Sequence, residues 1–254
     1  MRGSAAAVAL GAALALTAAG CATLGLGSAE QPEDATSVQT IEYYPFLVKG
    51  YQGSYPARTV LVLMPVDARD FVDTATSDHA PLGADPAIGV TLDQKQAVIQ
   101  RLYSLPLAPT LQAAIAKSAQ EAGMTATVSS QTQYQAGQKM TADYVLAAKI
   151  TRGWVIKRRG IEEQYGPTWS TDATFALAIT VYKPPFSVPF WQGATDSTYD
   201  DPPVASFALG PEDETGIYDN PGEVLSVALT RSVAGILDRA DFRSLVMQDQ
   251  IGRR

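Results

Sequence analysis

The chain of 254 residues contains one cysteine, Cys21, and one histidine, His79. A single cysteine cannot form an intrachain disulfide, so the fold has to be stabilised by burial and hydrogen bonding. A single histidine among Ser, Asp and Pro residues is typical of a solvated loop and excludes a histidine pair for a metal. The sequence also has no Gly-x-Ser-x-Gly motif and no glycine-rich phosphate loop. We therefore predict no metal, no cofactor and no catalytic residue.

Basic residues are fewer than acidic ones, 19 against 26, which gives a formal net charge of -7. The phosphates of nucleic acids and of anionic lipid headgroups repel a chain of this charge. The composition therefore argues against a nucleic-acid partner and against direct adhesion to anionic lipids. The length is sufficient for one large domain with a substantial core.

The N-terminus has the organisation of an export signal. Met1 and Arg2 precede an uncharged run from Ala5 to Ala19, which is shorter than the roughly 20 apolar residues of a membrane-spanning helix. Small residues, ending with Gly20, then precede Cys21. An ordinary signal that leaves Cys21 as a free thiol is one reading, although an unpaired exposed cysteine is unusual in a secreted protein.

The sequence Ala18-Ala19-Gly20-Cys21 resembles the lipobox of bacterial lipoproteins, although alanine replaces the commonest leucine. The resemblance implies cleavage between Gly20 and Cys21, a diacylglycerol on the sulfur of Cys21, and a fatty acid such as palmitate on its amine. The bilayer would then be a partner through acylated Cys21. Because Ala22 follows in place of a retaining aspartate, the resemblance implies an outer-membrane location facing the periplasm.

The rest of the chain is predicted to be one domain on a tether. Residues 1–20 are the signal peptide, and residues 21–57, rich in Gly, Ser, Thr, Pro and acidic side chains, form a lipidated, mostly disordered tether. Residues 58–247 form a single α/β periplasmic domain with a loop-helix insertion at about 67–105, and residues 248–254 form a tail. The apolar Tyr43, Tyr44 and Phe46 are expected to pack on the domain or to bind a partner.

Hydrophobic patterns predict the elements of the domain. The continuous apolar run at 59–66 is typical of a central strand, and strict alternation at 168–183 predicts a strand with one buried face. Further strands are expected at 124–128, 142–157, 189–194 and 204–209, with an exposed hairpin tip around Gly160. A capping box at Thr91 predicts a helix to about Tyr103.

Two main helices are expected as well, one from about Pro109 to a stop at Gly123 and one beginning at the N-cap Asn220. The predicted fold class is α+β, a mixed, mostly antiparallel sheet of about five strands with the two main helices packed on one face.

This layout resembles small envelope lipoprotein domains: the auxiliary lipoproteins of ABC-type transporters, the curli secretion lipoprotein and the lipoprotein activators of penicillin-binding proteins. The resemblance lies in residues 60–65, 142–146 and 190–193 and in the closing helix. It implies a non-enzymatic accessory or assembly subunit that docks on other envelope proteins. The oligomeric state is not implied by the resemblance.

Two alternative functions are considered. A cell-wall or glycan hydrolase would use paired carboxylates from two acidic clusters, which are expected in solvated loops. A lipid carrier would need a deep dry cavity between sheet and helices. The clusters consist of Asp196, Asp200 and Asp201, and of Glu212, Asp213, Glu214 and Asp219.

Overall fold

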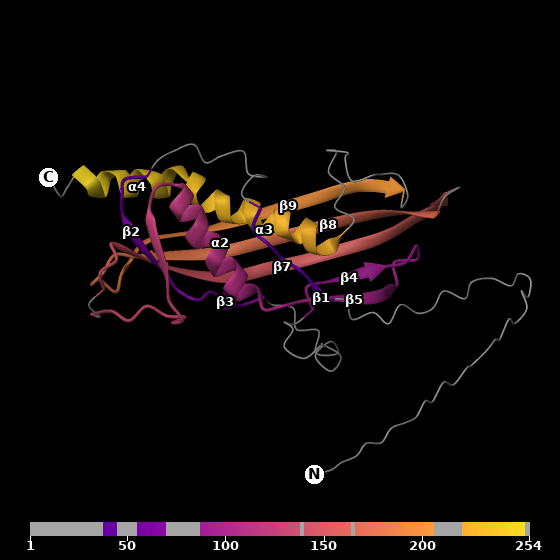
Figure 1. The fold of residues 1–254 in the computed structure, drawn as a ribbon, viewed down its shortest axis with the longest axis horizontal. Helices are drawn as coiled ribbons and strands as arrows, with labels where there is room; N and C mark the ends of the chain where they lie inside the picture. Colours follow the sequence, from indigo (N-terminus) through magenta and orange to yellow (C-terminus); the bar gives the residue numbers. More distant parts are fainter. Residues whose placement is uncertain are drawn as a thin grey trace, which may run out of the picture. The chain divides into compact units, whose positions relative to one another are not determined.

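The computed structural model describes residues 38–44, 55–69, 87–137, 140–163, 166–205 and 220–251, all within the second of two compact units, Ala35–Arg254. In this part of the chain, three helices lie over one face of a nine-stranded sheet (Figure 1). The helices are α2 (Leu107–Glu121), α3 (Pro221–Asp238) and α4 (Ala240–Ile251). None of these three is long and apolar enough to cross a membrane.

The strands follow one another along the chain with α2 between the fifth and the sixth. Their bounds are β1 (Val38–Gln39), β2 (Thr59–Val62), β3 (Val66–Asp67), β4 (Gly89–Leu92), β5 (Val98–Ser104), β6 (Thr125–Val128), β7 (Tyr144–Glu163), β8 (Gly166–Tyr182) and β9 (Pro189–Ala205).

Strand β7 is the centre of the sheet. Along one edge it pairs in parallel with β2, then β3, then β4. Along its other edge it pairs antiparallel with β8, which in turn pairs antiparallel with β9. β6 continues the sheet beyond β2, while β5 and then β1 continue it beyond β4. The predicted sheet of about five mostly antiparallel strands is therefore too small, and it lacks the parallel half.

Strands at the positions of β2 and β6 are predicted from the sequence, but the rest of the parallel half leaves a weak signal because its strands are short. β3 has two residues, and β2, β4 and β6 have four each. A strand of four residues places only two side chains on each face, which is too few to show alternation. The prediction that β2 lies inside the sheet is confirmed, since it pairs with β6 on one side and with β7 on the other.

A β-bulge in β7 explains the irregular hydrophobic pattern of this strand. The even-numbered residues from Tyr144 to Ile150 belong to the main core, whereas beyond Arg152 the odd-numbered Val155 does. The register with β8 shifts between Ile150 and Arg152. A bulge adds one residue to a strand, so the side chains that follow it exchange faces.

The predicted helix from Thr91 to about Tyr103 is wrong, because these residues form the β4–β5 hairpin. Oδ1 of Asp93 accepts hydrogen bonds from the backbone N–H groups of Lys95 and Ala97, both at 2.8 Å. Aspartate can cap either a helix or a turn, and here it closes the turn. The remainder of the predicted insertion, residues 70–86, lies outside the described residues.

Two predictions about the long strands are also corrected. β9 is one strand, where strands at 189–194 and 204–209 were predicted, so Asp196 and Asp200 lie in a strand and not in a loop. β7 extends to Glu163, so Gly160 lies within the strand, and the connection to β8 falls at residues 164–165, outside the described part. The alternation predicted for β8 is confirmed, since every second residue from Thr171 to Val181 is buried.

The two predicted main helices are confirmed. α2 begins two residues before Pro109, and Gly123 follows it with a φ of +92°. At the start of α3, Oδ1 of Asn220 accepts a hydrogen bond of 2.9 Å from the N–H of Gly222. α4 is an additional helix that reaches Ile251, so residues 248–251 are not a tail.

The folded domain also begins earlier in the chain than residue 58. β1 pairs with β5 through Val38 and Tyr103. Tyr55 is buried, and its hydroxyl donates a hydrogen bond of 2.8 Å to the carbonyl oxygen of Leu237. Parts of the predicted tether, residues 38–44 and 55–57, therefore belong to the domain.

Candidate functional site

The predicted lipidation and cleavage site, Gly20 and Cys21, lies outside the described residues, as do Phe46, His79 and the acidic cluster from Glu212 to Asp219. The described site residues are Tyr43 and Tyr44, Asp196 and Asp200, and the backbone of Asp201. These residues fall in two regions, the helix pair α2–α3 and the strand β9, and the structure does not bring them together into one site.

Tyr43 and Tyr44 lie in a segment that is fixed to α3 by its backbone. The N–H of Glu42 donates to Oγ of Ser226, and the N–H of Tyr44 donates to Oγ1 of Thr230, both at 2.9 Å. Ser226 and Thr230 are four residues apart on one face of the helix. Buried Ser and Thr on α3 therefore accept the hydrogen bonds that a neighbouring strand would otherwise accept.

The Tyr43 side chain lies against α2 and is half-buried. Its hydroxyl donates to Oε2 of Glu121 at 3.3 Å, and Nζ of Lys117 lies 5.8 Å from the ring centre. Burial raises the pKa of the Tyr43 phenol, and the negative charge of Glu121 raises it further, while a hydrogen bond with Ser118 lowers it. Tyr43 thus packs on the domain, one of the two expectations for this segment.

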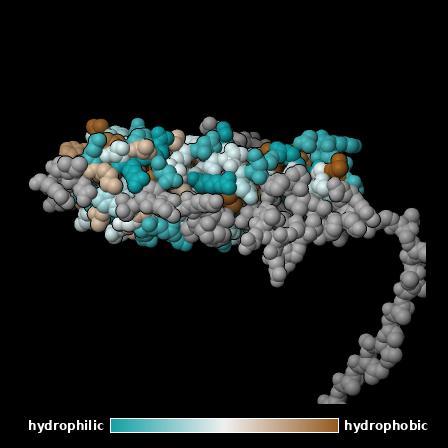
Figure 2. Space-filling view, turned by 90° about the horizontal axis from the view of Figure 1, so that it is seen from above, coloured by the Kyte–Doolittle hydropathy of each residue, from teal (hydrophilic) through white to brown (hydrophobic). Residues whose placement is uncertain are grey.

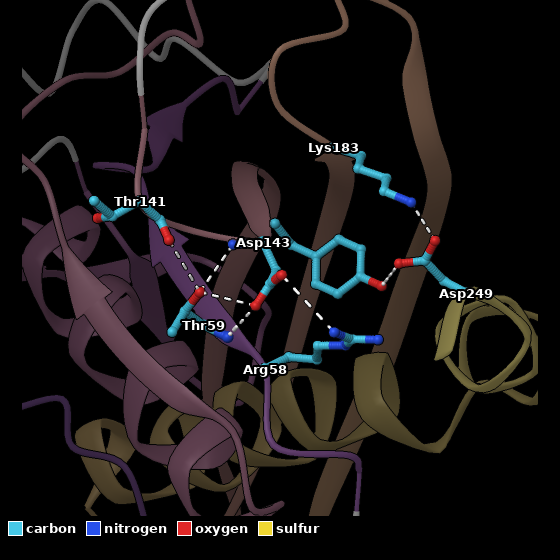
Figure 3. Close-up of polar contacts among 7 residues, drawn as sticks. Arg58, Thr59, Thr141, Asp143, Lys183 and Asp249 are labelled. Carbon is cyan, nitrogen blue, oxygen red and sulfur yellow. Dashed lines mark hydrogen bonds and ion pairs between the residues drawn. The ribbon is translucent and has the colours of Figure 1, made fainter. Parts of the chain in front are cut away.

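A cluster of polar side chains lies at the end of the sheet where β2 and β7 begin (Figure 3). Oδ2 of Asp143 accepts hydrogen bonds of 3.0 Å from both the N–H and the Oγ1 of Thr59. Oδ1 of Asp143 lies 3.9 Å from Nη1 of Arg58. The carboxylate therefore holds the first residue of β2 in register beside β7.

The second part of this cluster joins α4 to the sheet (Figure 3). The hydroxyl of Tyr144 donates a hydrogen bond of 2.8 Å to Oδ2 of Asp249, and Lys183 forms an ion pair with the other carboxylate oxygen. The Tyr144 ring packs against Phe190 with 5.3 Å between ring centres. Asp249 therefore connects α4 to the beginning of β7 and to the residue that follows β8.

The hydroxyl–carboxylate contacts in Figure 3 tie distant chain segments together. Asp143 accepts from the hydroxyl of Thr59 and Asp249 from that of Tyr144, and each carboxylate also lies beside a basic side chain, Arg58 or Lys183. Across the described part of the chain, no group of three or more His, Cys, Asp or Glu residues is arranged to hold a metal ion. The sequence offered no signal for this cluster, because its members are far apart along the chain.

The face of β7, β8 and β9 that points away from the helices is a broad polar surface, which we call the open face. Its side chains follow from the alternation of buried residues in β8 and the register of the three strands. The open face includes Arg152, Trp154, Ile156 and Arg158 of β7; Asp172, Thr174, Ala176, Ala178 and Thr180 of β8; and Gln192, Ala194, Asp196, Thr198 and Asp200 of β9.

Two of the three acidic residues of the open face lie beside arginines. Arg158 forms an ion pair with Asp172, and Nη1 of Arg152 lies 3.8 Å from Oδ2 of Asp196. Asp200 lies directly opposite Asp172 in the register. Arg152 and Asp196 flank a shallow hollow of about 390 Å³ over the small side chains of Ala176 and Ala194.

A small cavity lies between the sheet and the helices. Apolar side chains from β2, α2, β7 and α3 line it, among them Val60, Ile115, Leu146 and Val233. Its volume is about 20 Å³, which is close to the space that one water molecule needs. A cavity of this size cannot hold an acyl chain, so the space between the described parts of the sheet and helices does not provide the pocket that a lipid carrier needs.

No family model and no curated protein matches the chain. Similar solved structures include a protein of family DUF330 from Xanthomonas campestris, with a TM-score of 0.46 and 12% identity over 85% of this chain and 99% of that chain. A Helicobacter pylori protein described as a neuraminyllactose-binding hemagglutinin homolog has a TM-score of 0.42 and 10% identity over 84% and 99%. The lipoprotein GNA1162 from Neisseria meningitidis has a TM-score of 0.25 and 13% identity over 72% and 100%. These likenesses are too weak to assign a family or an activity.

Proposed function

We propose that this protein is a lipid-anchored periplasmic lipoprotein that serves as a non-enzymatic accessory or assembly subunit of an envelope transport, secretion or cell-wall complex. The lipobox-like sequence that ends at Cys21 supports the lipid anchor, and Ala22 after it supports an outer-membrane location. The acyl chains would hold the domain at the membrane, since each buried methylene contributes about 0.8 kcal/mol.

The observation that carries the subunit role is the open face. It extends over three long strands, its centre has small side chains such as Ala176, Ala178 and Thr180, and the described helices lie on the other side of the sheet. Small-molecule sites are usually deep and mostly apolar, whereas protein interfaces are broad and of mixed polarity. The half-buried Trp154 adds an aromatic residue of the kind that contributes most to binding at interfaces.

Replacement of Cys21 tests the anchor. In cells labelled with a palmitate analogue, the native protein should incorporate the label and fractionate with the outer membrane. Cys21→Ser should lose the label and appear in the soluble periplasmic fraction, while Ala22→Ser should behave as the native protein. An unmodified Cys21 thiol in the purified native protein, seen by mass spectrometry, would contradict lipidation.

Crosslinking with alanine-to-arginine variants tests the subunit role. Ala194→Arg adds a large charged side chain to the open face, and Ala113→Arg adds the same side chain to the exposed surface of α2. Crosslinking in intact cells should capture specific envelope proteins with the native chain and with Ala113→Arg, and should lose them with Ala194→Arg. Capture that Ala194→Arg leaves unchanged would place the interface elsewhere.

The glycan hydrolase is the alternative prediction, with Asp200 and Asp201 as its acidic residues. Asp200 is exposed on β9 opposite Asp172, and Asp172 is engaged by Arg158. The native protein should therefore release no fragments from purified peptidoglycan. A measurable release that Asp200→Asn abolishes would favour the hydrolase over the accessory subunit.

A further inference from the structure

Exposed large apolar side chains gather along one edge of the sheet. Among the described residues, eight such side chains are exposed, and four of them lie on β1, on β5 or directly after β5. We call these four the β5-edge patch: Val38, Val98, Ile99 and Leu105, which are 42%, 51%, 53% and 68% exposed. Figure 1 shows β1, β4 and β5 side by side along one margin of the sheet.

The four side chains are distributed along this edge and on both faces of the sheet, since neighbours in a strand such as Val98 and Ile99 point to opposite faces. Val38 pairs with Tyr103 of β5. Tyr103 lies two residues before Leu105 and five residues after Val98. At about 3.3 Å per residue, the patch extends over roughly 25 Å along β5. Residues 93–101 around it include Lys95 and Arg101 against one acidic residue, Asp93, whose Oδ1 is occupied by its own turn.

We propose that the β5-edge patch docks on the surface of the bilayer in which Cys21 is anchored. This proposal rests on the proposed function, because it takes the lipid anchor as given. The described domain begins at Val38, inside the patch itself. Seventeen residue steps separate Cys21 from Val38, and a chain of that length spans at most about 60 Å.

Attachment at this edge favours docking by this edge. A surface held on a short connection meets the bilayer at a high effective concentration, so even weak contacts are made most of the time. Exposed Val, Ile and Leu side chains gain free energy by entering the interface of the bilayer. The net charge of the chain opposes adhesion to anionic lipids, but the hairpin that bears Val98 and Ile99 has more basic than acidic residues.

One other face of the domain is less suited to lipid. The face seen from above in Figure 2 is mostly hydrophilic, with only small separate hydrophobic patches. Of the other exposed apolar side chains, Val128 lies on β6, which continues the sheet from the beginning of β7, whereas β4 and β5 lie further along that strand. Phe186 and Val188 lie between β8 and β9. Docking by the β5 edge would leave the open face available to a protein partner.

Depth-dependent quenching tests the proposal on the mature lipidated chain. Acylated Cys21 cannot react with a maleimide, so Val98→Cys and its matched control Val128→Cys can each be labelled at a single site with an environment-sensitive fluorophore. The protein is reconstituted into vesicles of phosphatidylethanolamine and phosphatidylglycerol that contain brominated phosphatidylcholine. We expect quenching at residue 98 to exceed quenching at residue 128 by about threefold or more, as for an apolar side chain in the interface.

Equal quenching at the two positions, quenching mainly at residue 128, or none at either would overturn the proposal. A label at residue 98 that becomes shielded without vesicles as the protein concentration rises would also overturn it, in favour of self-association. Circular dichroism confirms that both variants are folded. If mass spectrometry finds Cys21 without lipid, its thiol is coupled to a maleimide-bearing lipid and a solvatochromic residue replaces the cysteine label, so that docking is tested even when acylation fails.

Discussion

At the scale of single residues, two tyrosine hydroxyls differ in what they contribute to stability. Tyr144 is buried and donates to the carboxylate of Asp249 at 2.8 Å, whereas the hydroxyl of Tyr134 is buried with no hydrogen-bond partner among the described residues. Tyr144→Phe should lower the free energy of unfolding by about 1–3 kcal/mol, because it removes a hydrogen bond to a charged group. Tyr134→Phe, the matched control, should leave the free energy of unfolding unchanged or raise it. Urea denaturation of both variants measures the difference, and equal losses would contradict the role given to Asp249.

Asp241 gives a residue-scale prediction about pH. Hydrogen bonds from the Arg239 guanidinium hold the pKa of the Asp241 carboxyl well below its usual range, and the indole N–H of Trp191 and the backbone N–H of Phe242 act in the same direction. A carboxyl group with a lowered pKa stabilises the fold above its ordinary pKa of about 4, and this contribution is lost as the pH falls further. Asp241→Asn should therefore be less stable than the native protein at neutral pH, and the difference should shrink below pH of about 4. Thermal unfolding across pH measures it, and a constant difference would contradict the assignment.

At the scale of elements, two glycines of α3 differ in how closely a neighbouring segment approaches them. A Cβ on Gly222 would lie 2.5 Å from the carbonyl oxygen of Thr40, whereas a Cβ on Gly235 would make an ordinary contact of 3.5 Å with Thr195. Gly222→Ala should displace the segment at 38–44 and lower the free energy of unfolding by about 1–3 kcal/mol. Gly235→Ala should be neutral or stabilise by up to about 1 kcal/mol, since alanine favours a helix.

Hydrogen exchange locates the effect of the Gly222 substitution. The amides of Glu42 and Tyr44, which donate to Ser226 and Thr230, should exchange faster in Gly222→Ala and at the native rate in Gly235→Ala. Unchanged protection of these two amides in Gly222→Ala would show that the segment is held by other contacts.

At the scale of the whole molecule, the filled interior predicts no response to free lipid. A ligand that binds only the folded state raises the melting temperature, and the rise increases with the logarithm of its concentration once the site is mostly occupied. Because the cavity between sheet and helices measures about 20 Å³, palmitate or a short-chain phospholipid should leave the melting temperature of the protein unchanged. A rise that increases with lipid concentration would revive the lipid carrier.

Patterns within one element could be read from the sequence. The strict alternation of β8, the small apolar face of α2 with Gly123 after it, and the N-cap Asn220 of α3 all depend on residues close together in the chain. The same holds for the lipobox-like sequence at Cys21, which predicts an anchor without reference to the fold. Local patterns failed at Asp93, because its carboxylate caps a turn as readily as a helix.

The tertiary structure decided everything that depends on distant partners. β2 pairs in parallel with β6 and β7, although several other elements lie between them along the chain. The bulge after Ile150 fixes which residues of β7 face the helices. Asp249 receives a hydrogen bond from Tyr144 and an ion pair from Lys183, and no local pattern predicts either contact. The same is true of the pairing that brings Val38 to the edge formed by β5. The sequence by itself determined the kinds of element and the expected anchor, since those follow from neighbours along the chain. The pairing of strands and the surfaces they expose follow from which segments bury one another's apolar faces, and only the folded chain determines that.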